Sequence, residues 1–281
     1  MPEGDVVRLT AARLDEAMAG RMLVRSDLRW PGAAETDLVG RTVLANVPYG
    51  KHLFTRFDDG WSLHTHLRME GAWRLARTGT VGARGTASTT RVVLANAWWT
   101  AVGVRIGMLD VLRTRDEHRI TGPLGPDVLA DDFPADGLAA AVERLRTDDA
   151  AGGLGPRHRP DRAAQGVPVC EALLDQHTVA GLGTIWTAES LYAQRVWPWT
   201  PVRDVPDIGQ VLLAARDLMQ RIVRHGFGRE SDVAREVHGR AGRACHRCGT
   251  PVAVGSANDA PYDRPIFYCP SCQPAPSPGG A

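Results

Sequence analysis

Apolar residues in the first part of the chain follow two different periods. From Val6 to Met18 they recur every three or four positions, which predicts an amphipathic helix ending before Gly20. From Met22 to about Leu112 they form short runs of β type, separated by turn signals such as Asp58-Asp59-Gly60. One helix ahead of many short strands predicts an N-terminal β-sandwich or barrel with a leading helix.

The clearest strand patterns share aromatic or β-branched residues within four to seven positions. They span residues 41–45, 52–57, 61–67 and 91–94. Residues 77–90 are instead rich in Gly, Thr, Ser and Ala, which predicts a mobile loop.

The second half of the chain changes to helical patterns near Asp131. Residues 147–166 contain Gly152-Gly153 and two prolines, which predicts a linker or an exposed loop. Helical patterns resume from Val167 to His225, interrupted at Gly181-Leu182-Gly183 and again at 197–201. The overall class is therefore α+β.

We divide the chain into four segments on these changes of pattern. Residues 1–130 form the sandwich with its N-terminal helix, and residues 131–236 form a helical domain. Residues 237–273 form a cysteine-rich module with a β-hairpin pattern. Residues 274–281 are Pro, Ala, Ser and Gly and are expected to be disordered.

The amino-acid composition excludes only a few classes of function. The 281 residues carry a formal net charge of +1 and 23% charged residues, so any nucleic-acid surface must come from the distribution of charge. No apolar run approaches a membrane span, and Glu3 and Asp5 lie where a signal peptide needs basic residues. We expect a cytoplasmic protein with no membrane partner.

Lys51 is the only lysine among 33 Lys and Arg residues. It lies where a turn pattern gives way to a strand pattern. Lysine carries a compact charge whose pKa can shift, whereas arginine stays protonated. Lys51 is therefore either one survivor of a coding bias towards arginine or a residue kept for its amine chemistry.

Four of the five cysteines lie near the C-terminus with the spacing C-x2-C-x20-C-x2-C. Two such knuckles supply four thiolates for a tetrahedral zinc ion with no open position for catalysis. A redox dithiol pair and two disulfides are the alternatives, and a reducing compartment favours zinc. Cys170 lies on an apolar helical pattern and is predicted to be a buried small hydrophobe. The predicted ligands are Cys245, Cys248, Cys269 and Cys272.

Three separated stretches together resemble one family. They are the opening Met1-Pro2-Glu3-Gly4, the segment 173–186 around Gly181-Leu182-Gly183, and residues 237–245 ahead of the cysteines. In this order they are similar to the formamidopyrimidine-DNA glycosylase and endonuclease VIII family of base-excision repair enzymes. The resemblance implies a helix-two-turns-helix element in the helical domain and a zinc β-hairpin finger.

The resemblance assigns the chemistry to the N-terminus. Removal of Met1 would free the secondary amine of Pro2, and an α-amino group has a pKa of about 8, so part of it is neutral. By resemblance, Pro2 is the nucleophile that attacks C1′ of the damaged nucleotide, and Glu3 is the general acid. Glu3 could instead cap the first helix with a favourable helix-dipole interaction, and the two roles are compatible. Lys51 matches the family's lysine that contacts phosphate near the lesion.

Other residues are expected to hold the DNA around a flipped nucleotide. Met69 matches a wedge residue of the family, although a methionine on a strand pattern is also typical of a core. Arg105 follows a later strand, where the family's Pro-Arg-Arg-Phe type segment is absent. Gly183 and Thr184 match the phosphate-binding turn, with Thr184 in place of the usual Asn. Arg264 matches the finger arginine, and the resemblance implies that it takes part both in catalysis and in DNA binding.

The sequence thus predicts a bifunctional DNA glycosylase and AP lyase that cleaves the strand by β,δ-elimination. The Pro-Glu-Gly opening and the absent Pro-Arg-Arg-Phe segment resemble the endonuclease VIII branch more closely, which implies oxidised pyrimidines as substrates. Met69 instead resembles the branch that prefers oxidised purines. A non-catalytic DNA-damage binding paralogue and an RNA-binding zinc ribbon are the rival functions. We expect the protein to be a monomer. Its expected partner is double-stranded DNA with oxidised or abasic sites, or single-stranded or bubble DNA.

Overall fold

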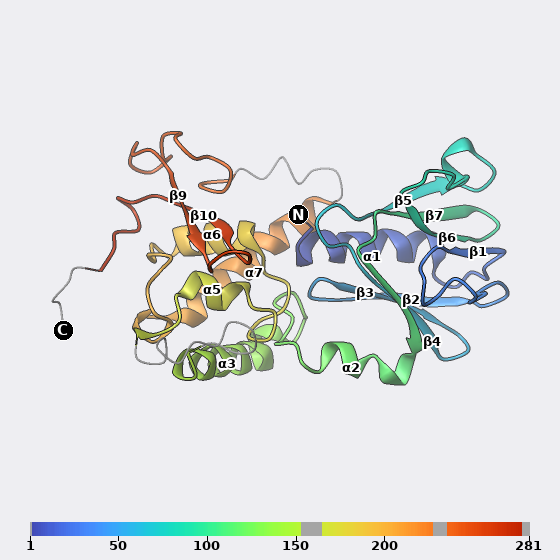
Figure 1. Ribbon diagram of the computed structural model, residues 1–281, viewed down its shortest axis with the longest axis horizontal. Coiled ribbons are helices and arrows are strands. Elements are labelled where there is room, and N and C mark those ends of the chain that lie inside the picture. The colour runs from blue at the N-terminus through green and yellow to red at the C-terminus, as the bar shows by residue number, and fades with distance from the viewer. Residues whose placement is uncertain (1, 153–164, 227–234, 277–281) are drawn as a thin grey trace. The chain divides into compact units, whose positions relative to one another are not determined.

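The computed structural model describes residues 2–152, 165–226 and 235–276 (Figure 1). The chain divides into two compact units, residues 1–123 and 124–281, which are described separately. Most of the expected linker at 147–166 and most of the expected tail lie outside the described residues. The division into four segments stays a prediction.

The first unit is a β-sandwich preceded by one helix. Helix α1 spans Gly4–Met18, as its apolar period predicted. Two four-stranded antiparallel sheets follow, with the strand orders β1-β6-β7-β5 and β2-β3-β4-β8. The strands are β1 Arg25–Leu28, β2 Val43–Tyr49, β3 His52–Phe57, β4 Trp61–His66, β5 Ala72–Arg77, β6 Thr90–Ala95, β7 Trp99–Val104 and β8 Met108–Arg113.

A hydrophobic core fills this unit and joins the helix to both sheets. Alternate residues of each strand point inward because side chains of a strand alternate between its two faces. Buried members of this core come from α1 and the two sheets, and include Val7, Leu14, Met18, Leu53, Phe57, Leu63, Leu109, Trp73, Val92, Leu94 and Ala101. Burial of this apolar surface is the main stabilising term of the unit.

Helix α1 lies along β2 in the opposite direction. The Gly20 N–H, just past the helix, donates to the Val43 carbonyl at 2.8 Å. Further along, Asp15 Oδ1 accepts from the backbone N–H of Asn46 at 2.6 Å and from its side-chain amide at 3.1 Å. Thr55 Oγ1 on β3 donates to Asn46 Oδ1 at 2.6 Å. The N-terminus of α1 therefore points towards the Tyr49 end of β2.

The segment between β5 and β6 contains a short 3-10 helix, η1, at Val81–Ala83. Ala83 is buried, and the Arg25 guanidinium on β1 donates to the carbonyls of Ala83 and Arg84 at 3.4 and 3.2 Å. The predicted loop is thus anchored at one point, and its mobility stays a prediction.

The end of the first unit is a pair of short helical turns, η2 Thr114–Asp116 and α2 His118–Thr121. Glu117 joins them to the sheet because its carboxylate accepts from Arg56 Nη2 at 2.6 Å and from the buried Ser62 hydroxyl at 2.6 Å.

The second unit combines helices with one β-hairpin. Among the described residues of this unit, the longest helix is the amphipathic α7, which ends at His225 with Gly226 as its C-cap, and α6 packs against it. Cys170 is fully buried in α5, as predicted. The helices are α3 Leu138–Ala150, α5 Val169–Leu174, α6 Thr184–Ala193 and α7 Ile208–His225, with short turns η3 Phe133–Gly137 and η5 Val202–Asp204, and the hairpin pairs β9 Ala253–Ala257 with β10 Arg264–Tyr268.

These elements confirm the predicted class: a sandwich with a leading helix, a helical middle and a C-terminal hairpin. Among the residues that the structure describes, no helix combines the length and the apolar character needed to cross a membrane.

We expect Asp15→Ala to lower the free energy of unfolding by about 1–3 kcal/mol, because it leaves two donors of the buried Asn46 without their acceptor. Urea unfolding followed by tryptophan fluorescence measures the change. Glu16→Ala, an exposed carboxylate on the same helix, is the matched control. Equal stabilities of the two variants would contradict this role of Asp15.

Candidate functional site

Three turns lie side by side along the edge of the sheet where strands β2, β3, β4 and β8 end or begin, and not along one of its outer strands. Tyr49 pairs with His52 across the two-residue turn that contains Lys51. His52 pairs with His66 at the end of β4, and His66 pairs with Met108 at the start of β8. The strand register therefore aligns the Lys51 turn, the turn after β4 and the turn before β8.

The N-terminus of α1 reaches the level of this edge. From the Asp15–Asn46 contact, Glu3 is twelve residues back along the helix, or about 18 Å. Lys51 is five residues forward along β2 and its turn, or about 17 Å. Because α1 and β2 run in opposite directions, Pro2 and Glu3 are brought to the end of the unit that carries Lys51.

Glu3 is the N-cap residue of α1 and only 1% exposed. Its carbonyl accepts the N–H of Val7, but its side chain forms no capping hydrogen bond. The capping alternative for the carboxylate is therefore not observed. The carboxylate is held at the start of a helix, where the helix dipole favours negative charge.

Met69 lies in the turn between β4 and β5 and is 62% exposed, so it does not belong to the core. Arg105, in the turn before β8, forms an ion pair with Glu70 at 3.1 Å. The two turns are packed together: the Gly107 N–H donates to the His66 carbonyl, and a Cβ at Gly107 would collide with the Arg68 side chain. The turn that carries Met69 thus packs against the turn that carries Arg105, at the end of the strands where the Lys51 turn also lies.

A chain of histidines beside Lys51 was missed by the sequence analysis. His52 Nδ1 lies 2.9 Å from His64 Nε2, and His64 Nδ1 lies 3.1 Å from Asp110 Oδ2. The His66 ring meets the His52 ring edge-on, with centroids 4.8 Å apart. The alternation of His64 and His66 on a strand pattern was the available signal, because it puts both on one face.

These imidazoles are neutral at physiological pH. Burial lowers the pKa of His52 to about 3, together with the smaller effects of His66, His64, Arg68 and Lys51. Burial and the same two cations lower the pKa of His66 to about 4. Burial also lowers the pKa of His64, against the opposing effect of Asp110.

In the second unit, the Gln176 side chain makes three hydrogen bonds that hold the loop between α5 and α6. The Gln176 amide donates to the carbonyls of Leu174 and Leu182, and its oxygen accepts the Gly181 N–H at 3.1 Å. Gly181 has a φ of +104°, a conformation that favours glycine.

Gly183 is the N-cap residue of α6, so Thr184 is the first helical residue and does not cap the helix. Backbone N–H groups at such a helix start can bind an anion.

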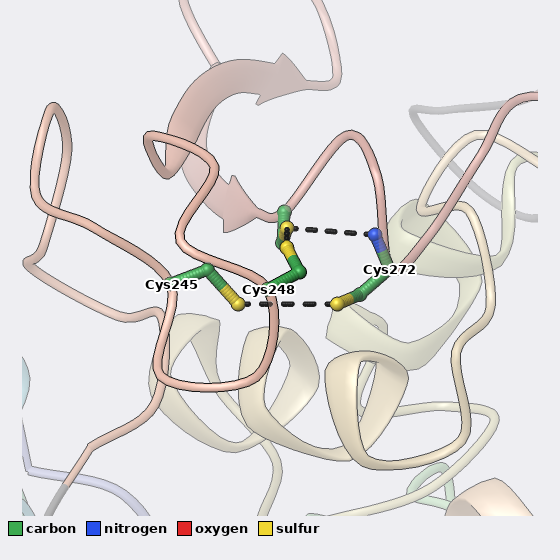
Figure 2. A group of neighbouring side chains, drawn as sticks. Cys245, Cys248 and Cys272 are labelled. Atoms are coloured by element: carbon green, nitrogen blue, oxygen red, sulfur yellow. Dashed lines mark hydrogen bonds between the residues drawn. The ribbon is translucent and has the colours of Figure 1, made fainter.

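The four C-terminal cysteines form one cluster (Figure 2). Their sulfurs all lie within 4.8 Å of one another, with Cys245 and Cys272 3.9 Å apart and Cys248 and Cys269 3.5 Å apart. A tetrahedral ion about 2.3 Å from each sulfur needs about 3.8 Å between sulfurs. All five cysteines of the chain are free thiols, so the disulfide alternative is not observed. The donor set fits one structural metal ion.

Tyr192 on α6 supports this cluster from outside. Its hydroxyl lies 3.2 Å from Cys245 Sγ, and its buried ring carries the Arg247 guanidinium at 4.0 Å. Burial raises the pKa of Cys245, but hydrogen bonds from Tyr192 and backbone N–H groups outweigh it and lower that pKa to about 6. The phenol thus favours the thiolate that a metal needs.

Glu189, also on α6, fixes the chain that enters the cysteine module. Its carboxylate accepts the backbone N–H groups of Glu236, Val237 and His238 at 2.8–3.0 Å. Three charge-assisted hydrogen bonds to one buried carboxylate tie this segment firmly to the helix that begins at Thr184.

Arg264 is the first residue of β10, exposed at the turn end of the hairpin. Its guanidinium donates to the carbonyl of the neighbouring Asp263 at 2.9 Å. Arg240 and Arg247 instead donate to carbonyls of their own unit. The roles that the resemblance gives to Arg264 and to the other site residues stay predictions.

We expect Tyr192→Phe to weaken metal binding about tenfold to a hundredfold, because an outer donor to one ligand is lost. The visible absorption of tetrahedral Co²⁺ during chelator competition measures it. Tyr268→Phe, which removes a hydroxyl in the ring stack with Trp197 and Trp199, is the control. Equal affinities in both variants would exclude the outer-ligand role.

Comparison with known proteins gives a consistent match. Residues 1–113 match the family model of the formamidopyrimidine-DNA glycosylase N-terminal domain. The whole chain is 43% identical to a probable endonuclease 8 2 of Streptomyces coelicolor, over 97% of that protein. It is 36% identical to a protein of Mycolicibacterium smegmatis named DNA-(apurinic or apyrimidinic site) lyase Nei2, with 98% of this chain and 100% of that protein covered.

The fold also matches solved structures. A Lactococcus lactis formamidopyrimidine-DNA glycosylase bound non-covalently to DNA with an AP site has a TM-score of 0.78 at 21% identity, with 97% of this chain and 100% of that chain covered. The corresponding protein of Thermus thermophilus has a TM-score of 0.73 at 24% identity, with 97% and 98% covered. The chain belongs to the formamidopyrimidine-DNA glycosylase and endonuclease VIII family of DNA glycosylases and AP lyases.

Proposed function

We propose that the protein removes oxidised pyrimidines from DNA and cleaves the strand at the resulting abasic site by β,δ-elimination. The observation that supports this most is the alignment of α1 with β2, through which Pro2 and Glu3 reach the edge that carries Lys51. An amine nucleophile, a carboxylic acid and a cation at one edge are the groups that this chemistry needs.

The reaction starts at the amine of Pro2, freed by removal of Met1. Its neutral lone pair attacks C1′ as the bond to the damaged base breaks. Glu3 protonates the sugar ring oxygen, and ring opening yields an iminium. Loss of a C2′ proton then expels the 3′ phosphate as the C3′–O bond breaks, and loss of a further sugar proton expels the 5′ phosphate as the C5′–O bond breaks. Water hydrolyses the remaining iminium, which frees Pro2 and releases the sugar remnant. Lys51 holds a phosphate beside the reacting sugar.

Contacts to DNA come from several turns. Met69 fills the gap left by the flipped nucleotide, since it is a flexible, exposed apolar side chain. Arg105 lies beside it and faces the opposite strand. The backbone at Gly183 and Thr184 and the guanidinium of Arg264 bind phosphates on either side of the lesion.

Zinc is the structural ion that we assign to the four cysteines. Four thiolates with no water position suit Zn²⁺ and leave it no catalytic role. The ion supplies folding free energy to a module of about forty residues that is too short to hold a large core. Cys245, Cys248, Cys269 and Cys272 would hold it.

Two narrower alternatives follow from specific features. Met69, a wedge typical of the purine-specific branch, favours excision of oxidised purines. Thr184 in place of the usual Asn favours a DNA-damage binding protein without catalysis. The retained Pro2, Glu3 and Lys51 favour the enzyme, because a protein that only binds needs none of the three.

Duplexes with an abasic site, an oxidised pyrimidine or an oxidised purine test the proposal in single-turnover cleavage assays. We expect processed protein that starts at Pro2 to cut the abasic and the pyrimidine substrates and to leave phosphate at both ends of the gap. Protein that retains Met1 or an N-terminal tag is the control and should not cut. Binding without cleavage by the processed protein would support the damage-binding alternative instead.

We expect Lys51→Arg to fold normally and to cut about tenfold or more slowly, because a planar guanidinium cannot reproduce the position of a compact ammonium. The thermal unfolding midpoint checks the fold, and single-turnover rates check the chemistry. Full activity in this variant would refute the role of Lys51.

We expect Arg264→Ala to weaken DNA binding and to flatten the dependence of log K on log salt by about one unit of slope. Fluorescence anisotropy at several salt concentrations measures both. Arg243→Ala, another exposed arginine of the same module, is the comparison. An unchanged slope in Arg264→Ala would count against a phosphate contact.

A further inference from the structure

The histidine chain on the outer side of β3, β4 and β8 has no assigned role. His52, Phe54, His64 and Asp110 lie on one face because each pair is related by the strand register: Phe54 pairs with His64, and His64 pairs with Asp110. Leu53 and Leu63 point to the opposite face and belong to the sandwich core. The histidines are therefore not core residues of the sandwich.

The chain is both buried and hydrogen-bonded. His64 is 0% exposed and stacks on Phe54 with centroids 5.0 Å apart. The side chain of Asp110 is 53% exposed and His52 is half-buried, so His64 is the most buried member of the chain. Burying polar rings is costly unless their nitrogens are paired, and here both nitrogens of His64 are. A leucine would fill the same space with no such cost.

The hydrogen-bond pattern fixes the position of each proton. A carboxylate only accepts, so His64 carries its hydrogen on Nδ1 and presents a lone pair at Nε2. His52 must then donate from Nδ1 to His64. The Nε2 of His52 is left as an acceptor, in one tautomer and one ring orientation.

Lys51 lies in the turn at the end of this chain that is opposite to Asp110. It precedes His52 directly, and its positive charge acts on both His52 and His66, as does that of Arg68. On the other side, His64 faces Asp110 and Glu117. The rings of His52 and His66 lie edge to face beside the turn that carries Lys51.

We propose that His52 is a positioning residue for Lys51, and that the chain from Asp110 through His64 holds the His52 ring in one tautomer against the turn that carries the lysine. The ring fixes the place of the ammonium without adding a second positive charge to compete for the phosphate. The inference rests on the proposed function in so far as Lys51 acts in the reaction.

A substitution at Asp110 interrupts the hydrogen-bonded histidine chain with the least disturbance of the fold, because Asp110 is exposed. Asp110→Asn keeps the shape but lets the amide N–H₂ face His64 Nδ1, which permits the wrong tautomer along the chain. Asp110→Glu keeps a carboxylate as the conservative variant. Asp27→Asn, which changes a half-exposed carboxylate paired with Arg29 in the other sheet, is the control.

The first readout does not need catalysis. Lys51 is the only lysine, so reductive methylation with ¹³C gives a single lysine signal in NMR spectra. We expect this signal to shift in Asp110→Asn, together with the ¹⁵N signals that report the tautomer of His52, and to stay in place in Asp110→Glu and Asp27→Asn. An unmoved Lys51 signal in Asp110→Asn overturns the proposal, whatever the activity.

The second readout is single-turnover cleavage of an abasic-site duplex. We expect Asp110→Asn to slow it about tenfold or more, with the Kd for DNA within about twofold, because a displaced group costs rate rather than binding. Wild-type rates in a variant with a shifted Lys51 signal overturn the positioning role. If Lys51→Ala is defective and Asp110→Asn is not, only this inference fails; if the wild type does not cleave, the proposed function fails.

Discussion

The contact between Asp15 and Asn46 determines how the first unit can work. It joins α1 to β2 through two hydrogen bonds on a single carboxylate oxygen, and Thr55 extends it to β3. Because α1 and β2 run in opposite directions, the contact sets the height of the helix N-terminus relative to the turn at Lys51. A helix rises about 1.5 Å per residue and a strand about 3.3 Å, so twelve residues of one match five of the other. The position of the N-terminus thus depends on an interaction well away from it.

The second unit depends on a comparable constraint in α6. Glu189 holds the chain that enters the cysteine module, and Tyr192, one turn later, donates to Cys245. The same helix starts at Thr184, after the loop that Gln176 holds. One short helix therefore carries the candidate phosphate-binding turn at its start and the support of the metal cluster at its end. We therefore expect a change in metal binding to alter the structure along this helix.

Sequence pattern predicted the elements well, because periodicity reports directly which face of a helix or strand is buried. The leading helix, the strand at 52–57 and the cysteine knuckles follow from local spacing. The histidine chain could not be predicted from local spacing, since it joins positions twelve and forty-six residues apart through strand register. The exposure of Met69 could not be predicted either, because a turn between two sheets interrupts the strand pattern there. The role of Pro2 and Lys51 came from resemblance, and only the direction of α1 along β2 gives it a physical basis.

The central claim is that the amine of Pro2 reacts with the sugar at the edge that carries Lys51. Borohydride reduction of the protein during cleavage of an abasic-site oligonucleotide, followed by digestion and mass spectrometry, locates the trapped sugar. The account predicts a reduced adduct on the N-terminal peptide that starts at Pro2, with a lower yield in Lys51→Ala. An adduct on the Lys51 side chain, or no adduct from processed, metal-loaded protein that binds the DNA, would contradict it.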